Sequence, residues 1–75
     1  MRIFMIDTKN IFLVTHDFED GTFEVSTLCN WMKLDQDMWL IPRKRKKMSW
    51  LILAAYDSRS EAQEHVEKLE KKYAA

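Results

Sequence analysis

The sequence contains only one cysteine, one proline and one glycine in 75 residues. A single thiol, Cys29, excludes an intrachain disulfide and fits a reducing compartment, where a lone cysteine is usually a small buried apolar residue. Gly21 alone excludes a glycine-rich phosphate-binding loop. The shortage of glycine and proline also predicts few sharp turns and no flexible linker, so we expect one small domain over residues 1–75.

Long apolar runs are absent as well. The run from Ile3 to Ile6 ends at Asp7, and it is too short for a signal-peptide core or a membrane span. We therefore expect a soluble, cytoplasmic protein without a membrane partner. Apolar residues nevertheless make up 47% of the chain and include three tryptophans, which is enough apolar surface to argue against disorder.

The formal net charge is zero, but the charges are unevenly distributed. Residues 1–42 hold three basic and seven acidic side chains, and residues 57–75 hold four and five. The cationic excess is therefore confined to one run, which consists of Arg43, Lys44, Arg45, Lys46 and Lys47.

This basic run allows three interpretations. It neutralises phosphates of a nucleic acid, it contacts an acidic protein surface, or it is a solvated turn that protects a sheet edge from aggregation. Trp39 and Trp50 flank the run and are placed to stack on bases if they are exposed. Four acidic residues surround the Asp-Gly turn: Asp17, Glu19, Asp20 and Glu24. They either solvate a loop, mimic the phosphates of a nucleic acid or contact a basic partner.

The Asp20-Gly21 pair predicts a tight hairpin, because this dipeptide supplies the positive φ angles of a type I′ turn. With the pair at the tip, Phe18 lies opposite Phe23 and Val14 opposite Thr27. The predicted strands of the chain are 2–7, a segment that starts at Ile11, the return strand of the hairpin, 38–41 and 48–56.

The C-terminal part predicts an amphipathic helix. Residues 58–61 have the form of a capping box, and Ala62, Val66, Leu69 and Tyr73 then form one apolar stripe on a charged helix. A weaker spacing also predicts a short helix at about 27–34. The expected fold is α+β, with an antiparallel sheet of four to five strands packed against the C-terminal helix.

The strand at 48–56 is apolar on both sides, which is typical of a strand buried on both faces. One helix covers only one face, so the other face needs the 27–34 segment, curling of the sheet, a second copy of the chain or a partner. If side chains alternate strictly along this strand, one face carries Trp50, Ile52, Ala54 and Tyr56, and the other face carries Leu51, Leu53 and Ala55.

No motif indicates catalysis, a cofactor or a metal. His16, Cys29 and His65 have spacings that match no zinc or thiol-enzyme pattern. The segment 35–37 lacks the further ligands and the glycine of a calcium loop. We expect no catalytic, cofactor-binding or metal-binding residues and no enzyme activity.

In length, single-domain build and lack of motifs, the chain is similar to small accessory proteins of bacteriophages and mobile elements, among them inhibitors of host defence. The sequence therefore predicts a small non-enzymatic binding protein that modulates a larger nucleic-acid-processing or defence complex by stoichiometric protein–protein contact, with a homodimer as a further option. The alternative is a DNA- or RNA-binding module that uses a basic hairpin at 43–47. The residues expected to contact either partner are Arg43, Lys44, Arg45, Lys46, Lys47, Trp39 and Trp50.

Overall fold

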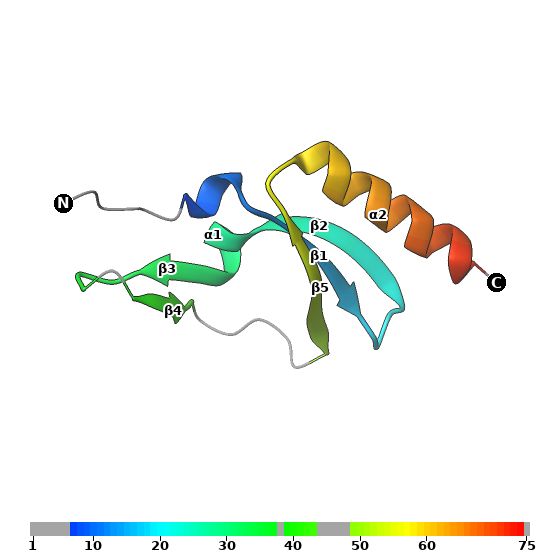
Figure 1. Cartoon of the computed structure of the whole chain (residues 1–75). Helices are drawn as coiled ribbons and strands as arrows, with labels where there is room; N and C mark the ends of the chain where they lie inside the picture. Colours follow the sequence, from blue (N-terminus) through cyan, green and yellow to red (C-terminus); the bar gives the residue numbers. More distant parts are fainter. Residues whose placement is uncertain (1–6, 38, 44–48, 75) are drawn as a thin grey trace.

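The computed structural model describes residues 7–37, 39–43 and 49–74. It confirms the α+β class (Figure 1). No helix within the described ranges is long and apolar enough to cross a membrane. The elements in chain order are a 3₁₀ turn η1 (Thr8–Asn10), β1 (Phe12–Asp17), β2 (Thr22–Thr27), α1 (Leu28–Trp31), β3 (Met32–Leu34), β4 (Leu40–Pro42), β5 (Trp50–Tyr56) and α2 (Arg59–Lys72).

The five strands divide into two antiparallel sheets instead of one. The larger sheet has the order β2-β1-β5, and β3 and β4 form the second sheet. In Figure 1, α2 crosses one face of the larger sheet and the small sheet lies to the side, away from α2. The predicted strand at 2–7 lies outside the described residues except for Asp7, whose side chain caps η1 by accepting from the Lys9 amide.

The β1–β2 hairpin keeps the predicted faces but not the predicted register. His16 pairs with Phe23 and Asp17 with Thr22, so the loop comprises residues 18–21 instead of the Asp-Gly pair alone. Gly21 closes this loop with a φ of +73°. The shift moves the pairing by an even number of residues, and side chains alternate with a period of two, so the strand residues keep their faces. Phe18, which the predicted register places on the face of Val14, lies in the loop instead.

The core lies between α2 and the middle of the larger sheet. Val14, Ala62 and Val66 are buried there, and Leu69 packs against them at the edge. The predicted stripe of α2 is confirmed at these positions. Tyr73 follows the last helical residue and is 63% exposed, although its ring stacks on that of Phe23.

The opposite face of the sheet is covered at its centre by the chain itself. Leu13 and Thr15 of β1 are buried on that side. Trp31, at the end of α1, lies against Trp50 with ring centroids 5.8 Å apart, and its indole N–H donates to Ser26 Oγ. From the 27–34 segment, Trp31 therefore lies over part of this face, between Ser26 of β2 and Trp50 of β5.

The predicted helix at 27–34 is wrong beyond Trp31. Met32 pairs with Pro42 and Leu34 with Leu40, which holds this segment extended as β3. The Arg43 amide continues the ladder by donating to the Trp31 carbonyl oxygen. Pairing with β4 thus outweighs a helical pattern that was incomplete.

The predicted pairing of the strands on either side of the basic run is also wrong. β4 pairs with β3, whereas β5 pairs with β1. The described strands on either side of the run, β4 and β5, therefore do not pair with each other. Lys44, Arg45, Lys46 and Lys47 lie outside the described residues, as do Met38 and Met48, the first residues of two predicted strands.

Candidate binding surface around β5

Within the part of the chain that the structure describes, the most apolar strand, β5, is an outer strand of the larger sheet. Leu51, Ile52 and Leu53 expose 48%, 49% and 45% of their surface, and we call these three residues the β5 surface. The strand that is buried on both faces is β1, where Leu13, Val14 and Thr15 are consecutive buried residues. A contiguous exposed apolar patch of this kind commonly marks an interaction site.

A β-bulge decides which way the side chains of β5 point. Val14 pairs with Ala54, but the next residue of β1, Thr15, pairs with Ile52, so Leu53 is the extra residue. Residues that pair directly share a face, which puts Ile52 on the face of Thr15 and Ala54 on the face of α2. Strict alternation along this strand is therefore wrong, because a bulge reverses the sides beyond it.

A groove adjoins the β5 surface on the helix side. It has a volume of about 480 Å³ and opens to solvent between β5, the hairpin loop and the end of α2. His16 stacks on Phe23 with ring centroids 4.4 Å apart, and the His16 Nδ1–H donates to the Thr22 carbonyl oxygen. The groove is lined by His16, Gly21, Phe23, Leu53, Leu69 and Tyr73.

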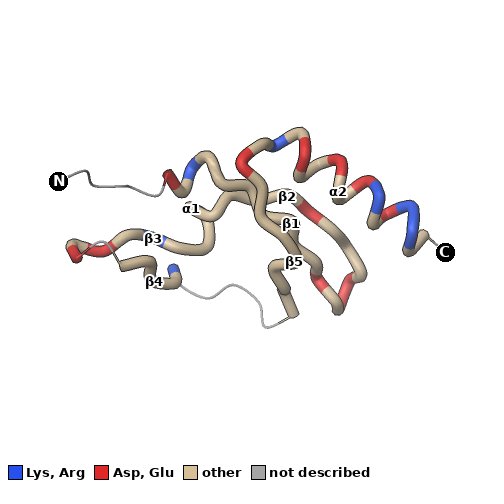
Figure 2. Tube along the Cα trace, viewed as in Figure 1, with Lys and Arg blue, Asp and Glu red and all other residues tan. Residues whose placement is uncertain are grey.

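The acidic hairpin lies beside the first residue of β5. Figure 2 shows acidic residues at the loop between β1 and β2, close to the start of β5. Glu19, Asp20 and Glu24 are exposed, whereas Asp17 is buried. This end of the β5 surface therefore carries negative charge next to apolar side chains.

Asp17 joins the hairpin to β5. The Trp50 indole N–H donates to Asp17 Oδ2 at 2.7 Å, and the Glu19 amide donates to Oδ1 at 3.0 Å. Burial by itself would raise the pKa of Asp17, but hydrogen bonds from Trp50, Ser49 and the backbone amides of Glu19 and Asp20 outweigh it and hold this pKa well below its usual range. Asp17 is therefore ionised at neutral pH.

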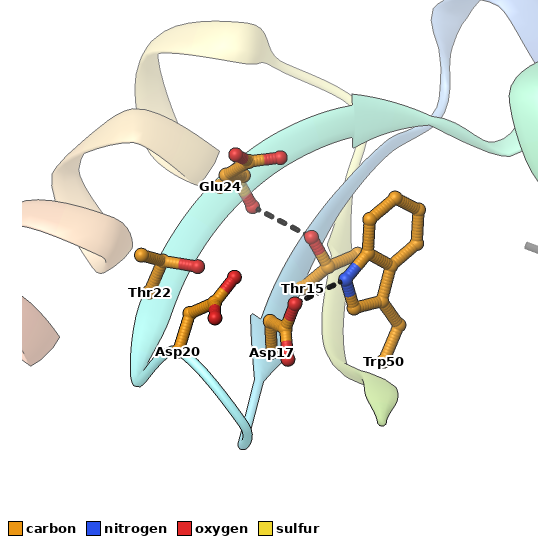
Figure 3. A pocket seen from close by; sticks show the side chains of 6 residues that line it. All are labelled: Thr15, Asp17, Asp20, Thr22, Glu24 and Trp50. Atoms are coloured by element: carbon orange, nitrogen blue, oxygen red, sulfur yellow. Dashed lines mark hydrogen bonds between the residues drawn. The ribbon is translucent and has the colours of Figure 1, made fainter. Parts of the chain in front are cut away.

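A small polar cavity of about 90 Å³ surrounds these contacts (Figure 3). The Asp17 and Asp20 side chains and the Trp50 indole lie around it, and Thr15 Oγ1 donates to the Glu24 carbonyl oxygen at 3.2 Å. The hydrogen bonds drawn there tie the three strands of the larger sheet together, so we assign this cavity a structural role.

The structure distributes the predicted partner-binding residues over different elements. Trp39 is 70% exposed and precedes β4 of the small sheet. Trp50 is half-buried on β5 and bonded to Asp17. The Arg43 Nε–H donates to the Cys29 carbonyl oxygen, so this side chain contributes to the local structure. The other four predicted residues, Lys44 to Lys47, lie outside the described ranges.

Sequence reasoning missed two parts of this region. The groove was not found, because its lining comes from three strands and a helix that alternation alone does not bring together. Trp31 belongs to the predicted 27–34 helix, and the sequence did not show that its ring would lie against Trp50 on the second face of the sheet. The apolar character of 48–56 was a usable signal for the β5 surface; its position at the sheet edge was not visible in the pattern.

The histidines and Cys29 do not converge. His65 Nδ1 and the Tyr56 hydroxyl lie 3.0 Å apart in a hydrogen bond, His16 is on the hairpin, and Cys29 is half-buried in α1. Among the residues that the structure describes, no group of three or more His, Cys, Asp or Glu side chains could hold a metal ion.

Comparisons with protein-family models, with curated proteins and with solved structures found no match to this chain.

Proposed function

We propose that this protein is a non-enzymatic binding protein that docks stoichiometrically on a partner protein through the β5 surface. The observation that carries this proposal is the exposure of Leu51, Ile52 and Leu53 on both sides of an edge strand. Apolar area of this kind supplies affinity when it is buried against a complementary surface.

The acidic hairpin supports a partner with a basic surface. Glu19, Asp20 and Glu24 form an exposed negative rim at the Trp50 end of β5. Rim charges of opposite sign orient a partner and raise the association rate. Proteins that process nucleic acids present basic surfaces to phosphates, so a nucleic-acid-processing or defence complex is the class of partner that we propose.

A capture experiment with matched variants tests the proposal. Tagged protein is incubated with an extract of the cells in which it naturally occurs, and the captured protein is identified by mass spectrometry, purified and titrated back. We expect a defined stoichiometry that Leu51→Lys abolishes and that Gln63→Lys, at an exposed position of α2 outside the groove lining, leaves unchanged. A partner that binds both variants equally well contradicts the proposal.

Salt separates this proposal from direct binding of DNA or RNA through Arg43 to Lys47. Binding through phosphate contacts weakens steeply as salt rises, and alanine replacement of all five basic residues abolishes it. Docking through the β5 surface is expected to survive both changes. Gel-shift assays on single- and double-stranded nucleic acids at low salt provide the direct comparison.

A further inference from the structure

The groove on the helix side of the larger sheet has an aromatic wall. The rings of His16 and Phe23 stack on each other, and the Tyr73 ring stacks on Phe23 with centroids 6.0 Å apart. The Tyr73 backbone N–H donates to the Leu69 carbonyl oxygen, which holds this residue at the end of α2. Because Tyr73 is exposed, the aromatic surface of this wall is open to an occupant of the groove.

A second, more polar hollow adjoins this wall. Gly21, Phe23 and Tyr73 line both the groove and the second hollow, which has a volume of about 350 Å³. Two exposed carboxylates also line the second hollow, Glu24 on β2 and Glu70 on α2. The surface therefore offers apolar contact in the groove and negative charge beside it, with aromatic rings shared by the two.

The Tyr73 ring already attracts a cation from its own chain. The Lys72 ammonium lies over this ring, 5.4 Å from the ring centroid, which is within the range of a cation–π interaction. Lys72 is exposed in the last turn of α2. A contact of this kind at an exposed site is weak, so a cation of a partner can replace it at small cost.

We infer that this groove holds an arginine side chain of the partner protein, with the guanidinium at the Tyr73 ring and beside Glu24 and Glu70. An apolar residue next to that arginine would lie in the groove against Leu53 and Leu69. Arginine fits better than lysine, because its planar guanidinium stacks on aromatic rings and carries donors for two carboxylates. The inference rests on the proposed function, because it names the side chain by which a basic partner is held.

NMR titration of the purified, isotope-labelled full chain tests the inference with a defined probe, the peptide acetyl-Leu-Arg-Leu-amide. We expect saturable shifts of the Phe23 and Tyr73 amide signals. The same peptide with citrulline in place of arginine keeps the shape but loses the charge, and it should bind about tenfold more weakly. A peptide with lysine at this position should also bind more weakly. The absence of saturable shifts, or binding of the citrulline or lysine peptide as tight as that of the arginine peptide, overturns the inference.

Two pairs of matched variants test the geometry. Glu70→Gln should weaken binding of the arginine peptide about threefold, whereas Glu64→Gln makes the same charge change at a different hollow of α2 and should have little effect. Lys72→Gln removes the competing ammonium and should strengthen binding about twofold relative to Lys71→Gln, which changes the charge equally. Equal effects within either pair overturn the inference. Circular dichroism checks that all four variants are folded.

Ile52→Lys separates a failure of this inference from a failure of the proposed function. Ile52 pairs with Thr15 and faces the side of the sheet opposite α2. The substitution should therefore abolish capture of the partner and leave binding of the arginine peptide unchanged. Peptide binding without any captured partner supports the groove and contradicts the proposed function alone. Capture of a partner that Glu70→Gln does not weaken overturns this inference alone.

Discussion

Trp50 donates its indole N–H to the Asp17 carboxylate at 2.7 Å, although the two residues are 33 positions apart in the chain. They also pair in the ladder as the first residue of β5 and the last of β1. The bond fastens the start of β5 to the hairpin loop, directly beside the β5 surface. The edge strand is therefore held at one end by a buried ionised group.

Asp17→Asn is expected to make the free energy of unfolding depend less on pH between neutral pH and pH 3. The folded pKa of Asp17 lies below its unfolded value, so the carboxylate contributes stability above about pH 4, and this contribution is lost as the pH falls from there toward the folded pKa. Asparagine keeps a hydrogen-bond acceptor but has no charge to lose. Urea unfolding at neutral pH and at pH 3 should show a lower stability of the variant at neutral pH and a smaller difference between the two conditions than in the wild type. Asp57→Asn, at the exposed start of the β5–α2 connection, is the control and should behave as wild type.

Val14→Ala is expected to destabilise the protein by roughly 2 kcal/mol, because it removes two methyl groups from a fully buried site between β1 and α2. Val25→Ala, at a half-buried position of the same face, should cost less. Chemical denaturation of both variants provides the comparison. Equal losses would place the centre of the core elsewhere.

Ser58→Ala is expected to cost about 1 kcal/mol, because the Ser58 hydroxyl accepts a hydrogen bond from the Glu61 amide at the start of α2. Ser58→Asp retains an acceptor at this position and should restore most of the loss. The return contact from the Glu61 side chain, which the capping-box pattern also predicts, stays a prediction. Glu61→Ala tests it separately by thermal unfolding.

Gly21→Ala is expected to destabilise the hairpin by about 1 kcal/mol, because the backbone at Gly21 has φ +73°, a conformation that side chains other than asparagine and aspartate rarely adopt. No atom lies within 4 Å of an added Cβ, so the cost is conformational and not steric. Gly21→Asn should therefore be milder. A larger loss for asparagine than for alanine in urea unfolding would contradict this explanation.

Local chemistry predicted the elements that depend on neighbouring residues. The stripe of Ala62, Val66 and Leu69, with a serine cap before it, places α2 correctly because helix formation and capping act over one or two turns. The Asp-Gly pair located the hairpin, but it could not set the register. Asp17 instead starts a longer loop, in which its side chain accepts from the Glu19 amide.

The candidate site was predictable only in part. The apolar character of 48–56 pointed to a surface that needs a cover, and the structure leaves Leu51, Ile52 and Leu53 half exposed. The expected location was the face opposite the helix, which Trp31 and Trp50 cover in part. The bulge at Leu53 has no signature in the alternation of apolar residues, so the sides assigned to β5 were wrong beyond it.

The sequence by itself determined the fold class, the C-terminal helix and the residues of β1 and β2 that face it, because periods of 3.6 and two residues follow from the backbone and are visible in the order of side chains. Only the tertiary structure decided which strand became central. Strand order depends on contacts between residues far apart in the chain, such as Asp17 with Trp50. Among the described strands, these contacts placed the moderately apolar β1 in the middle of the larger sheet and the most apolar strand beside it as an outer strand.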